Sequence, residues 1–540
     1  MPDATRFEPL QWSDMAIMAP ELVLGAWFVL LVVLDLLLPG RLRRSSWIGG
    51  LTLVGLAGAG ALVLLRLLVM NNGGEPALVI SLLGDSYRID DFGSLLKLLI
   101  LAGTGLVVLL GLGSADGDGA ITDKGEYFYL LLPAALGAMM MASSGNLITL
   151  YVGLELLAIT SYVLVGLRRR SVLSAEAAFK YVVTGGIASA FILFGMSYLY
   201  GVTGSVELGA IREALPGAAA SYEAFLYVGF GCMLGGIAIK IAAAPFHAWS
   251  LDVYQGAPSP VAAFLAVVSK GAALAMALRI LFSTALFAGS GSDTGAELGS
   301  DLFFAVLLIA ALSMLFGTLA ALRQSNVKRL LALSGVANAG YLLVPIGVGV
   351  TMTHSNNVTE LLFYLVAYLL MTLGAFAVLT VVSRAVGHDE LKGFAGMYYR
   401  APWTAAAMTI FVLSLAGLPV SAGFFGKLFI LLGAANGKHY GIVAVMVLSS
   451  VISYYFYFGL IRQMFMRSSD GLLSEREARL REGDEEASAP AAAVIRVPVP
   501  IGIVIWTCAI LTFALGVYPQ PVVAAIDFLF SIMTDLLPGR

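Results

Sequence analysis

The chain has 540 residues and a formal net charge of −3; 59% of its residues are hydrophobic and only 12% are charged. Soluble globular proteins carry about 25% charged residues, so this composition excludes a soluble protein. Apolar runs of about 20 residues, the length that crosses a bilayer, recur along the whole chain. They are continuous rather than alternating, which excludes a β-barrel and predicts an all-α polytopic membrane protein.

Polar breaks divide the chain into about fourteen predicted spans. The first run has no basic segment before it and is too long for a signal-peptide core, so we interpret it as a retained span. The twelfth run contains Pro419 and is too long for one straight helix, which predicts two half-helices. The predicted spans are 15–38, 47–70, 91–113, 127–143, 146–167, 175–200, 224–247, 257–282, 301–322, 329–351, 358–383, 402–434, 440–464 and 497–517.

The distribution of basic residues predicts how these spans are oriented. With the N-terminus outside, the inner loops hold 18 of the 31 Lys and Arg residues and the outer loops hold five. Inner loops are rich in Lys and Arg, so both ends of the chain are predicted on the outer side. The polar tract 466–496 then lies inside, where its charge and its Ala and Pro content indicate a mobile loop or a short surface helix. Pro519 and Pro521 stop the last helix, so we expect the tail to end along the outer surface.

Two broken helices, at Pro245 and Pro419, lie five spans apart. An odd number of spans inverts the second copy, so the pattern predicts two inverted five-helix repeats, as in many transporters. The predicted domains are an N-terminal three-helix segment (1–126), a first antiporter-like repeat of helices 4–8 (127–282), a second repeat of helices 9–13 (301–464), and a final part with the polar loop, helix 14 and the tail (465–540).

Four charged residues, Glu155, Lys240, Lys270 and Lys427, fall inside apolar spans. Each would cost about 2.5–3.5 kcal/mol at the centre of a lipid-facing helix, so they are expected to face the bundle interior, a partner or water. Pro245 frees backbone carbonyls, which are tolerated only where protein or water binds them. The stretch "IAIKIAAAPFHAW" therefore indicates an ion site.

Glu155 has no basic residue nearby in its own helix, so it is either protonated or paired with another helix. Lys240 and Lys180 are the candidate partners. One interpretation is a static ion pair that fixes packing; the other is a switchable pair whose opening releases the proton of Lys240. Lys180 lies near the end of its span, where reaching the inner interface is an equal alternative.

Lys270 is the natural next proton acceptor, and Lys427, two turns after the second break, is a candidate terminal site on the outer side. Static roles remain open for both. His247 either relays protons between Lys240 and Lys270 or caps the carbonyls freed by Pro245, and we favour the relay.

The remaining charges in the spans carry weaker signals. Glu21 and Asp35 stand near the ends of the first span and are interpreted as structural. Single basic residues that reach an interface or a lipid headgroup are Arg66, Lys97 and Arg279.

No motif for a redox cofactor is found in the sequence. Cys232 and Cys508 lie far apart and cannot hold an iron–sulfur cluster alone, and no Gly-rich nucleotide loop precedes a helix. We therefore expect no cofactor and no metal on this chain.

Five segments together resemble a known family. They are "LELLAITSYVLVGL", "AAFKYVVTGGIASAFILFGMSYLYGVTG", "KIAAAPFHAWSLDVYQGAPSPVAAFLAVVSK", "VKRLLALSGVANAGYLL" and "LSLAGLPVSAGFFGKLFIL". They resemble the subunit N family of the proton-pumping NADH–quinone oxidoreductase, bacterial respiratory complex I, over spans four to thirteen. The signature "PFHAWSLDVYQGAPSP" favours subunit N over the related subunits L and M, as does Lys427, because L and M carry a carboxylate there.

The resemblance implies a fourteen-helix antiporter-like subunit in the membrane arm, located in the bacterial inner membrane. Neighbours would be subunits M, K and J, with NADH, FMN, iron–sulfur clusters and quinone bound by partner subunits, and with no nucleic acid. Asn338 stands where relatives carry a histidine; it cannot carry a proton, so water would serve there. The residues that match the family's charged positions in helices five, six, seven, eight and twelve are Glu155, Lys180, Lys240, Lys270 and Lys427.

We therefore predict a proton-translocating subunit of complex I. One alternative is a subunit of a cation/proton antiporter that uses the same residues but runs on a gradient. Another is a structural membrane scaffold whose lysines bind lipid or neighbouring subunits.

Overall fold

The computed structural model describes residues 12–37, 45–71, 79–114, 121, 124–285, 293–349, 356–466 and 495–529. Within them, thirteen helices are long and apolar enough to cross a membrane. The predicted run 402–434 is divided into two shorter helices, as expected from Pro419. The all-α polytopic fold is thus confirmed, whereas the predicted inner loop 466–496 lies almost wholly outside the described residues.

The N-terminal part contains three long helices and a small hairpin that the sequence did not predict. Its elements are α1 (Trp12–Ile17), α2 (Ala19–Leu37), α3 (Ser45–Asn71), β1 (Ile80–Leu82), β2 (Tyr87–Ile89) and α4 (Asp91–Ser114). The two strands pair antiparallel, with Ser81 opposite Arg88.

The next part runs through the first break. Its elements are α5 (Lys124–Tyr129), α6 (Leu131–Ala142), α7 (Leu147–Val165), α8 (Val172–Thr203), α9 (Leu208–Lys240), α10 (Ala248–Gly256), α11 (Ser259–Phe264), the π-helical turn η2 (Leu265–Ser269) and α12 (Lys270–Ser283).

The last part contains the second break. Its elements are α13 (Asp293–Ala321), α14 (Val327–Gly347), α15 (Asn357–Val386), the 3-10 turn η4 (Leu391–Phe394), α16 (Met397–Arg400), α17 (Pro402–Ala416), α18 (Ala422–Asn436), α19 (Tyr440–Phe465), α21 (Val499–Val517) and α22 (Gln520–Leu529). The predicted stop after the fourteenth span is present, but the tail continues as a new helix, α22.

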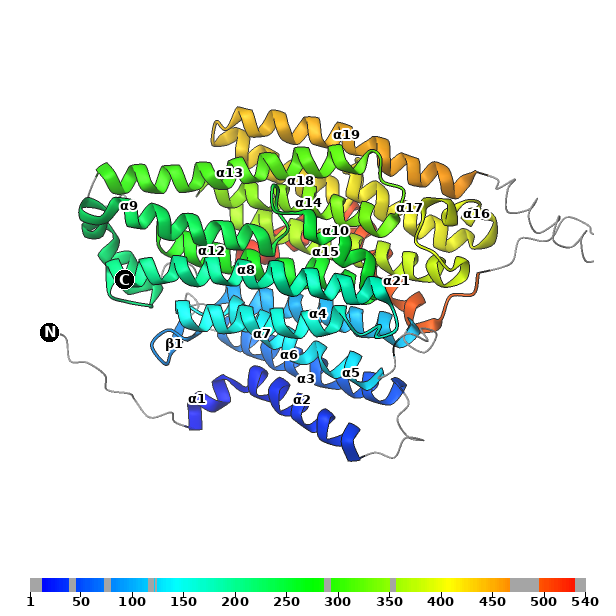
Figure 1. Cartoon of the computed structure of the whole chain (residues 1–540), viewed down its shortest axis with the longest axis horizontal. Helices are drawn as coiled ribbons and strands as arrows, with labels where there is room; N and C mark the ends of the chain where they lie inside the picture. Colours follow the sequence, from blue (N-terminus) through cyan, green and yellow to red (C-terminus); the bar gives the residue numbers. More distant parts are fainter. Residues whose placement is uncertain are drawn as a thin grey trace, which may run out of the picture.

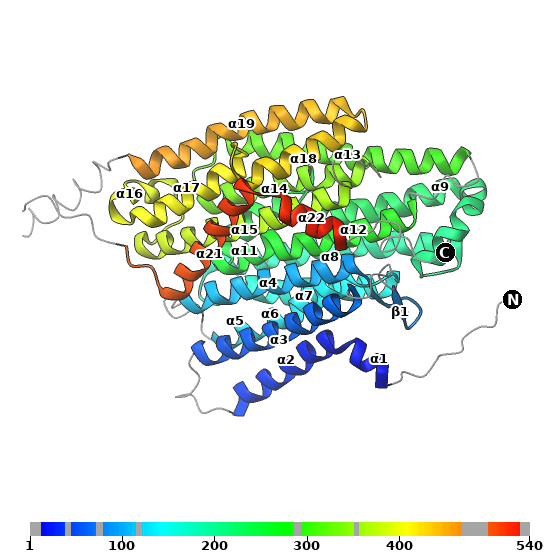
Figure 2. The same ribbon diagram turned by 180° about the vertical axis from the view of Figure 1, so that it is seen from behind.

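The long helices lie side by side along one direction, with α2 at one edge of the bundle and α19 at the other (Figures 1 and 2). α14 and α15 lie in the middle and are buried along most of their length. The peripheral helices instead expose apolar side chains such as Phe191 and Phe304, as a surface in lipid requires.

The basic elements gather at one end of the bundle. α5 and α16 lie there, whereas α1 and β1 lie at the opposite end (Figure 1). α5 begins at Lys124 and α16 ends at Arg400, both in predicted inner loops. The arrangement agrees with the predicted sidedness, and the orientation of the termini stays a prediction.

The first break is longer than the sequence indicated. We predicted a span over 224–247 interrupted at Pro245, but α9 already ends at Lys240 and the chain resumes helix only at Ala248. In between, Ala242 adopts a positive φ of 57°, and the Ala244–Pro245 peptide is cis. The Ala244 N–H donates to Ser313 Oγ of α13 over 2.9 Å, which fixes the non-helical segment against the bundle.

The second break, between α17 and α18, has a similar form. α17 ends at Ala416, Gly417 follows in the left-handed region, and Val420 has a φ of 65°. A positive φ is rare for a β-branched residue, and such strained residues cluster at functional sites. Both breaks therefore combine a helix end with a non-glycine residue in a left-handed conformation.

Candidate functional site

Lys240 lies in the last turn of α9, at the edge of the first break. The Trp249 indole of α10 donates to the Ile239 carbonyl over 3.0 Å, which joins the two halves of the broken helix. The C-terminal end of a helix carries a partial negative charge, so Lys240 occupies a position that stabilises a cation.

Glu155 of α7 interacts electrostatically with Lys240, but no ion pair within 4.0 Å joins them in the described part of the chain. Glu155 Oε1 is buried without a hydrogen-bond donor, and the Lys240 ammonium instead lies 3.5 Å from the Tyr162 hydroxyl. Both charged residues are half-buried. The structure therefore holds this pair in a separated arrangement.

Lys180 does not pair with Glu155. Its ammonium lies 2.6 Å from Asp252 Oδ2 and 2.7 Å from Glu176 Oε1. Asp252 also accepts from Arg329 of α14 over 2.7 Å, so this carboxylate joins α8, α10 and α14 at the end of the bundle with the basic loops. The sequence interpretation missed Asp252, although its place within "PFHAWSLDVYQGAP" was a usable signal.

A row of hydroxyl groups lies between Lys240 and Lys270. The Tyr162 ring packs edge-on against Tyr181, with centroids 4.8 Å apart. The buried Tyr181 hydroxyl interacts with the hydroxyl of Ser269, which directly precedes Lys270. The row thus runs from α7 through α8 to η2.

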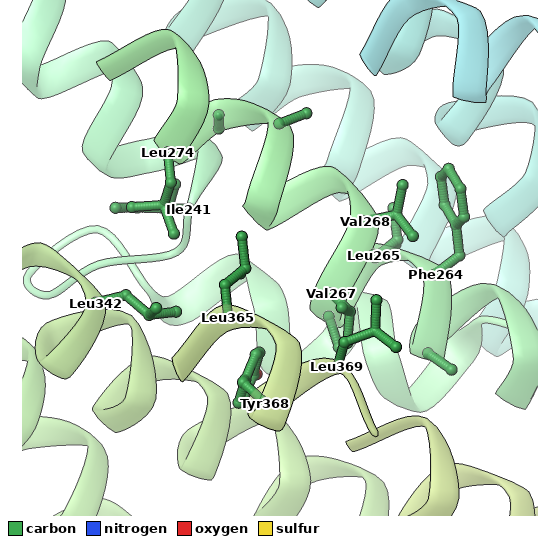
Figure 3. Close-up of a cluster of buried hydrophobic side chains, with 14 of the residues drawn as sticks. Ile241, Phe264, Leu265, Val267, Val268, Leu274, Leu342, Leu365, Tyr368 and Leu369 are labelled. Carbon is green, nitrogen blue, oxygen red and sulfur yellow. The ribbon is translucent and has the colours of Figure 1, made fainter. Parts of the chain in front are cut away.

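Lys270 is buried at the start of α12, directly after the π-helical turn η2. Such turns are frequent at functional sites. Its ammonium donates to the Gly335 carbonyl of α14 over 2.5 Å, and no carboxylate pairs with it within the described ranges. Figure 3 shows the apolar packing beside this contact, where Val267 of η2 faces Leu369 of α15.

Hydrogen-bonding groups continue from Gly335 along α14. The Ser334 and Tyr457 hydroxyls are hydrogen-bonded, and Asn338 Nδ2 donates to the Ser334 carbonyl over 2.9 Å. The Tyr364 hydroxyl of α15 donates to Asn338 Oδ1 over 2.6 Å. Asn338 thus has a defined place in the row, as a hydrogen-bonding link that carries no charge.

Lys427 lies at the far end of this row. Its ammonium donates to the Leu415 carbonyl over 2.7 Å and lies 4.7 Å from the centre of the Tyr341 ring. The Leu415 carbonyl belongs to the last turn of α17, so Lys427 binds the helix end that the second break leaves open.

His247 lies outside the row. Its ring interacts with the Pro245 carbonyl and lies 6.3 Å from the Phe316 ring, while Nδ1 is buried without a partner. No hydrogen bond links it to Lys240 or Lys270 within the residues described. The geometry favours the capping interpretation over the relay.

The position of Lys97 contradicts the sequence interpretation, which expected this lysine to reach an interface or a lipid headgroup. It is fully buried, and its ammonium lies 2.6 Å from Glu21 Oε1. The Tyr87 hydroxyl donates to Glu21 Oε2 over 2.7 Å, and burial together with Glu21 raises the pKa of Tyr87 so that it remains a donor. Arg66 also lies within the protein, 3.2 Å from the same hydroxyl. The pairing depends on which helices meet, which the sequence did not reveal.

Arg279 also contradicts the sequence interpretation, because its side chain does not reach an interface or a lipid headgroup. It is 1% exposed and binds Asp90 through two hydrogen bonds, of 2.5 Å from Nη1 and 2.7 Å from Nη2, and it also donates to the Ala142 carbonyl. Burial acts to raise the pKa of Asp90, but the charge and hydrogen bonds of Arg279 outweigh it and keep the pKa below its usual value. This clamp ties the β-hairpin and the end of α6 to α12.

The described residues contain no group of three or more His, Cys, Asp or Glu side chains that could hold a metal ion. The arrangement instead offers proton carriers: isolated amines at helix ends, joined by hydroxyl and amide groups. Groups of these kinds can donate and accept protons.

Comparison with known sequences identifies relatives over nearly the whole length. Residues 144–453 match the family described as NADH:quinone oxidoreductase/Mrp antiporter, TM. The chain is 62% identical to NADH-quinone oxidoreductase subunit N of Paenibacillus sp. (strain JDR-2), covering 98% of this chain and 99% of that one. It is 42% identical to subunit N of Geobacillus sp. (strain WCH70), covering 93% and 96%.

Solved structures agree with this relationship. Respiratory complex I from Thermus thermophilus contains a chain of 31% identity that superimposes with a TM-score of 0.73, over 95% of this chain and all of that one. A chain of the Mrp complex from Dietzia sp. DQ12-45-1b superimposes with a TM-score of 0.76 over 94% and 97%, and at 21% identity this likeness concerns the fold alone.

Proposed function

The chain belongs to the NADH-quinone oxidoreductase subunit N family, and from that premise we propose that protons cross it along the row of polar groups from Lys240 to Lys427. The protein is a proton-translocating, multi-pass membrane subunit of NADH-quinone oxidoreductase, respiratory complex I. The path through the chain and the role of each residue on it are proposed here from the geometry.

The proton begins on Lys240, whose charge is favoured by the end of α9 and by Glu155. When Glu155 moves further from Lys240, the charge of the half-buried ammonium is stabilised less, and the ammonium gives its proton to the Tyr162–Tyr181–Ser269 row and then to Lys270. The position of Tyr162, Tyr181 and Ser269 between the two lysines is the observation that carries the proposal.

From Lys270 the proton passes along α14 to Lys427. Along this stretch, hydrogen bonds join Ser334, Asn338 and Tyr364 to their neighbours. Asn338 holds these groups in position but does not itself take up the proton. Lys427 receives the proton at the second helix break. His247 is assigned to holding the first break, and Lys180 to the Asp252 contact that positions α10.

Energy for transport would reach the chain at Glu155. This residue is half-buried on α7, whose neighbouring side chains Ile148, Val152 and Ile159 are exposed and apolar, so a partner subunit can pack there. Membrane-arm subunits like M, K and J are the proposed neighbours. NADH, FMN, iron–sulfur clusters and quinone are placed in other subunits of the complex.

The proposed division into two inverted repeats has further support. Asn146 caps α7 and pairs with Glu207, and Asn326 caps α14 and pairs with Glu390 in the same way. The first pair starts helix five and the second starts helix ten, as two copies of one unit require. With the basic loops inside, both chain termini are placed on the outer side of the bacterial inner membrane.

Replacing Lys240 with alanine tests the path. Intact complex I carrying Lys240→Ala, reconstituted in vesicles, is expected to reduce quinone with fewer protons moved per electron. Lys438→Ala, in an outer loop, is the matched control and keeps the normal ratio. A normal ratio in the Lys240→Ala complex would contradict the proposal and favour a structural role for the buried charges.

A further inference from the structure

Glu360 is a buried carboxylate that the path described above leaves unused. It lies in the first turn of α15 and is 2% exposed. In the part of the chain that the structure describes, no basic side chain and no hydrogen-bond donor binds its carboxylate. Burying a charge without a partner destabilises the folded protein, so the presence of Glu360 at this position needs an explanation.

The Glu360 carboxylate packs on the helix that carries Lys427. A methyl group added at Gly433 of α18 would lie 2.6 Å from Glu360 Oε2, so this close approach needs a glycine. Gly433 follows Lys427 by six residues, a rise of about 9 Å along the helix. The carboxylate therefore lies beside α18, beyond Lys427 and toward the end opposite the basic loops.

Glu360 also follows the polar row on its own helix. It stands one turn from Tyr364, whose hydroxyl binds Asn338 and whose ring packs on Gly426, the neighbour of Lys427. α15 and α18 thus meet at two glycines, one beside Lys427 and one beside Glu360. The row and the carboxylate share one helix interface.

A second carboxylate, more exposed than Glu360, lies on a helix that packs against α15. Asp527 of α22 acts electrostatically on Glu360 and is half-buried. α22 continues from α21 and lies along the bundle beside α15 (Figure 2). Two carboxyl groups that lie together without a cation share a proton readily.

We propose that Glu360 and Asp527 form the proton-release pair of this subunit, which carries protons from Lys427 to the outer face. The inference rests on the proposed path and extends it by two residues. The Lys427 ammonium loses its proton and becomes a neutral amine, and Glu360 becomes a neutral carboxylic acid by way of bridging water. Glu360 then passes the proton to Asp527 and regains its charge, and Asp527 releases it to solvent.

A structural role is the competing explanation, because an acid in the first turn of a helix stabilises the helix dipole. The test therefore uses Glu360→Gln, which keeps the shape and polarity of the side chain but cannot carry a proton, and Glu360→Asp, which can. Each is measured as intact complex I in vesicles, by protons moved per electron. Asp301→Asn is the matched control, because Asp301 only accepts a hydrogen bond from Tyr227 at an exposed position.

Glu360→Gln is expected to lose as much pumping as Lys427→Ala, and Glu360→Asp to restore most of it, while Asp301→Asn pumps normally. If Lys427→Ala abolishes pumping and Glu360→Gln does not, the release pair is wrong and the path stands. If neither variant changes the ratio, the path itself is wrong.

If the complex that carries Glu360→Gln does not assemble, Asp527→Lys provides a second test of the proposal. A lysine at this half-buried position would form an ion pair with Glu360 and hold it in the charged state. Pumping is then expected to fall to the level of Lys427→Ala, and unchanged pumping would overturn the proposal.

Discussion

Gly335 offers a sharp test of the Lys270 site, because the glycine itself is chemically inert. Its carbonyl binds the Lys270 ammonium over 2.5 Å. A methyl group at Gly335 would lie 3.3 Å from Lys270 Nζ and 3.1 Å from the Tyr368 hydroxyl, both closer than ordinary contacts. Gly335→Ala should therefore push the ammonium away from the carbonyl without removing any titratable group.

The size of the effect follows from the bond that is lost. A hydrogen bond to a charged group contributes about 1.5–3 kcal/mol. If that loss is expressed in the barrier for proton transfer through Lys270, the rate falls about 10- to 150-fold, since each 1.36 kcal/mol is a factor of ten. Pumping through this subunit would then be slower than quinone reduction.

Gly271→Ala is the matched control. Gly271 is also buried and directly follows Lys270, but a methyl group there would meet only Leu365 at 3.6 Å, an ordinary contact. Initial rates of vesicle acidification and of NADH oxidation, measured together on both variants, check the reasoning. Normal acidification by Gly335→Ala, or equal impairment by Gly271→Ala, would refute the role assigned to the carbonyl contact.

Three further predictions concern the supporting charges. Arg279→Met leaves the buried Asp90 with Arg88 as its remaining ion-pair partner and should lower the free energy of unfolding by about 1.5–3 kcal/mol, the contribution of a charged hydrogen bond, seen as a lower melting temperature of the complex. Because the pKa of Asp90 is held below its usual value, the stability from this clamp is complete above about pH 4 and is lost as the pH falls further, so acid melting curves of wild type should converge on those of Arg279→Met. Asp252→Asn should reduce pumping by loosening α10 from α8 and α14, whereas Glu176→Gln, which removes only the exposed partner of Lys180, should pump normally.

Sequence patterns predicted most of the fold because spans are set by length and hydrophobicity. The division of 402–434 follows from Pro419, which cannot continue a helix, and α17 and α18 confirm it. The first break was placed too late, because the residues from Ile241 to Ala244 are apolar and carry no signal that the helix has already ended at Lys240.

The candidate site was predictable in its charges but not in their partners. Burial of Lys270 and Lys427 follows from the cost of a charge in lipid. That each amine binds a backbone carbonyl, of Gly335 and of Leu415, could not be read from the chain, because carbonyls have no sequence signature. Asp90 and Arg279 are 189 residues apart, and only the packing of α12 against α4 and α6 brings them together.

The two helix breaks explain how lysines can hold protons inside this protein. Lys240 ends α9, and Lys427 binds the end of α17, so each ammonium faces the negative end of a half-helix. That partial charge is fixed and cannot be switched. Lys240 has, in addition, Glu155 on another helix, close enough to act electrostatically on its ammonium. A change in the distance between Glu155 and Lys240 would therefore change the proton affinity of Lys240, which is the step that the proposed path needs at its start.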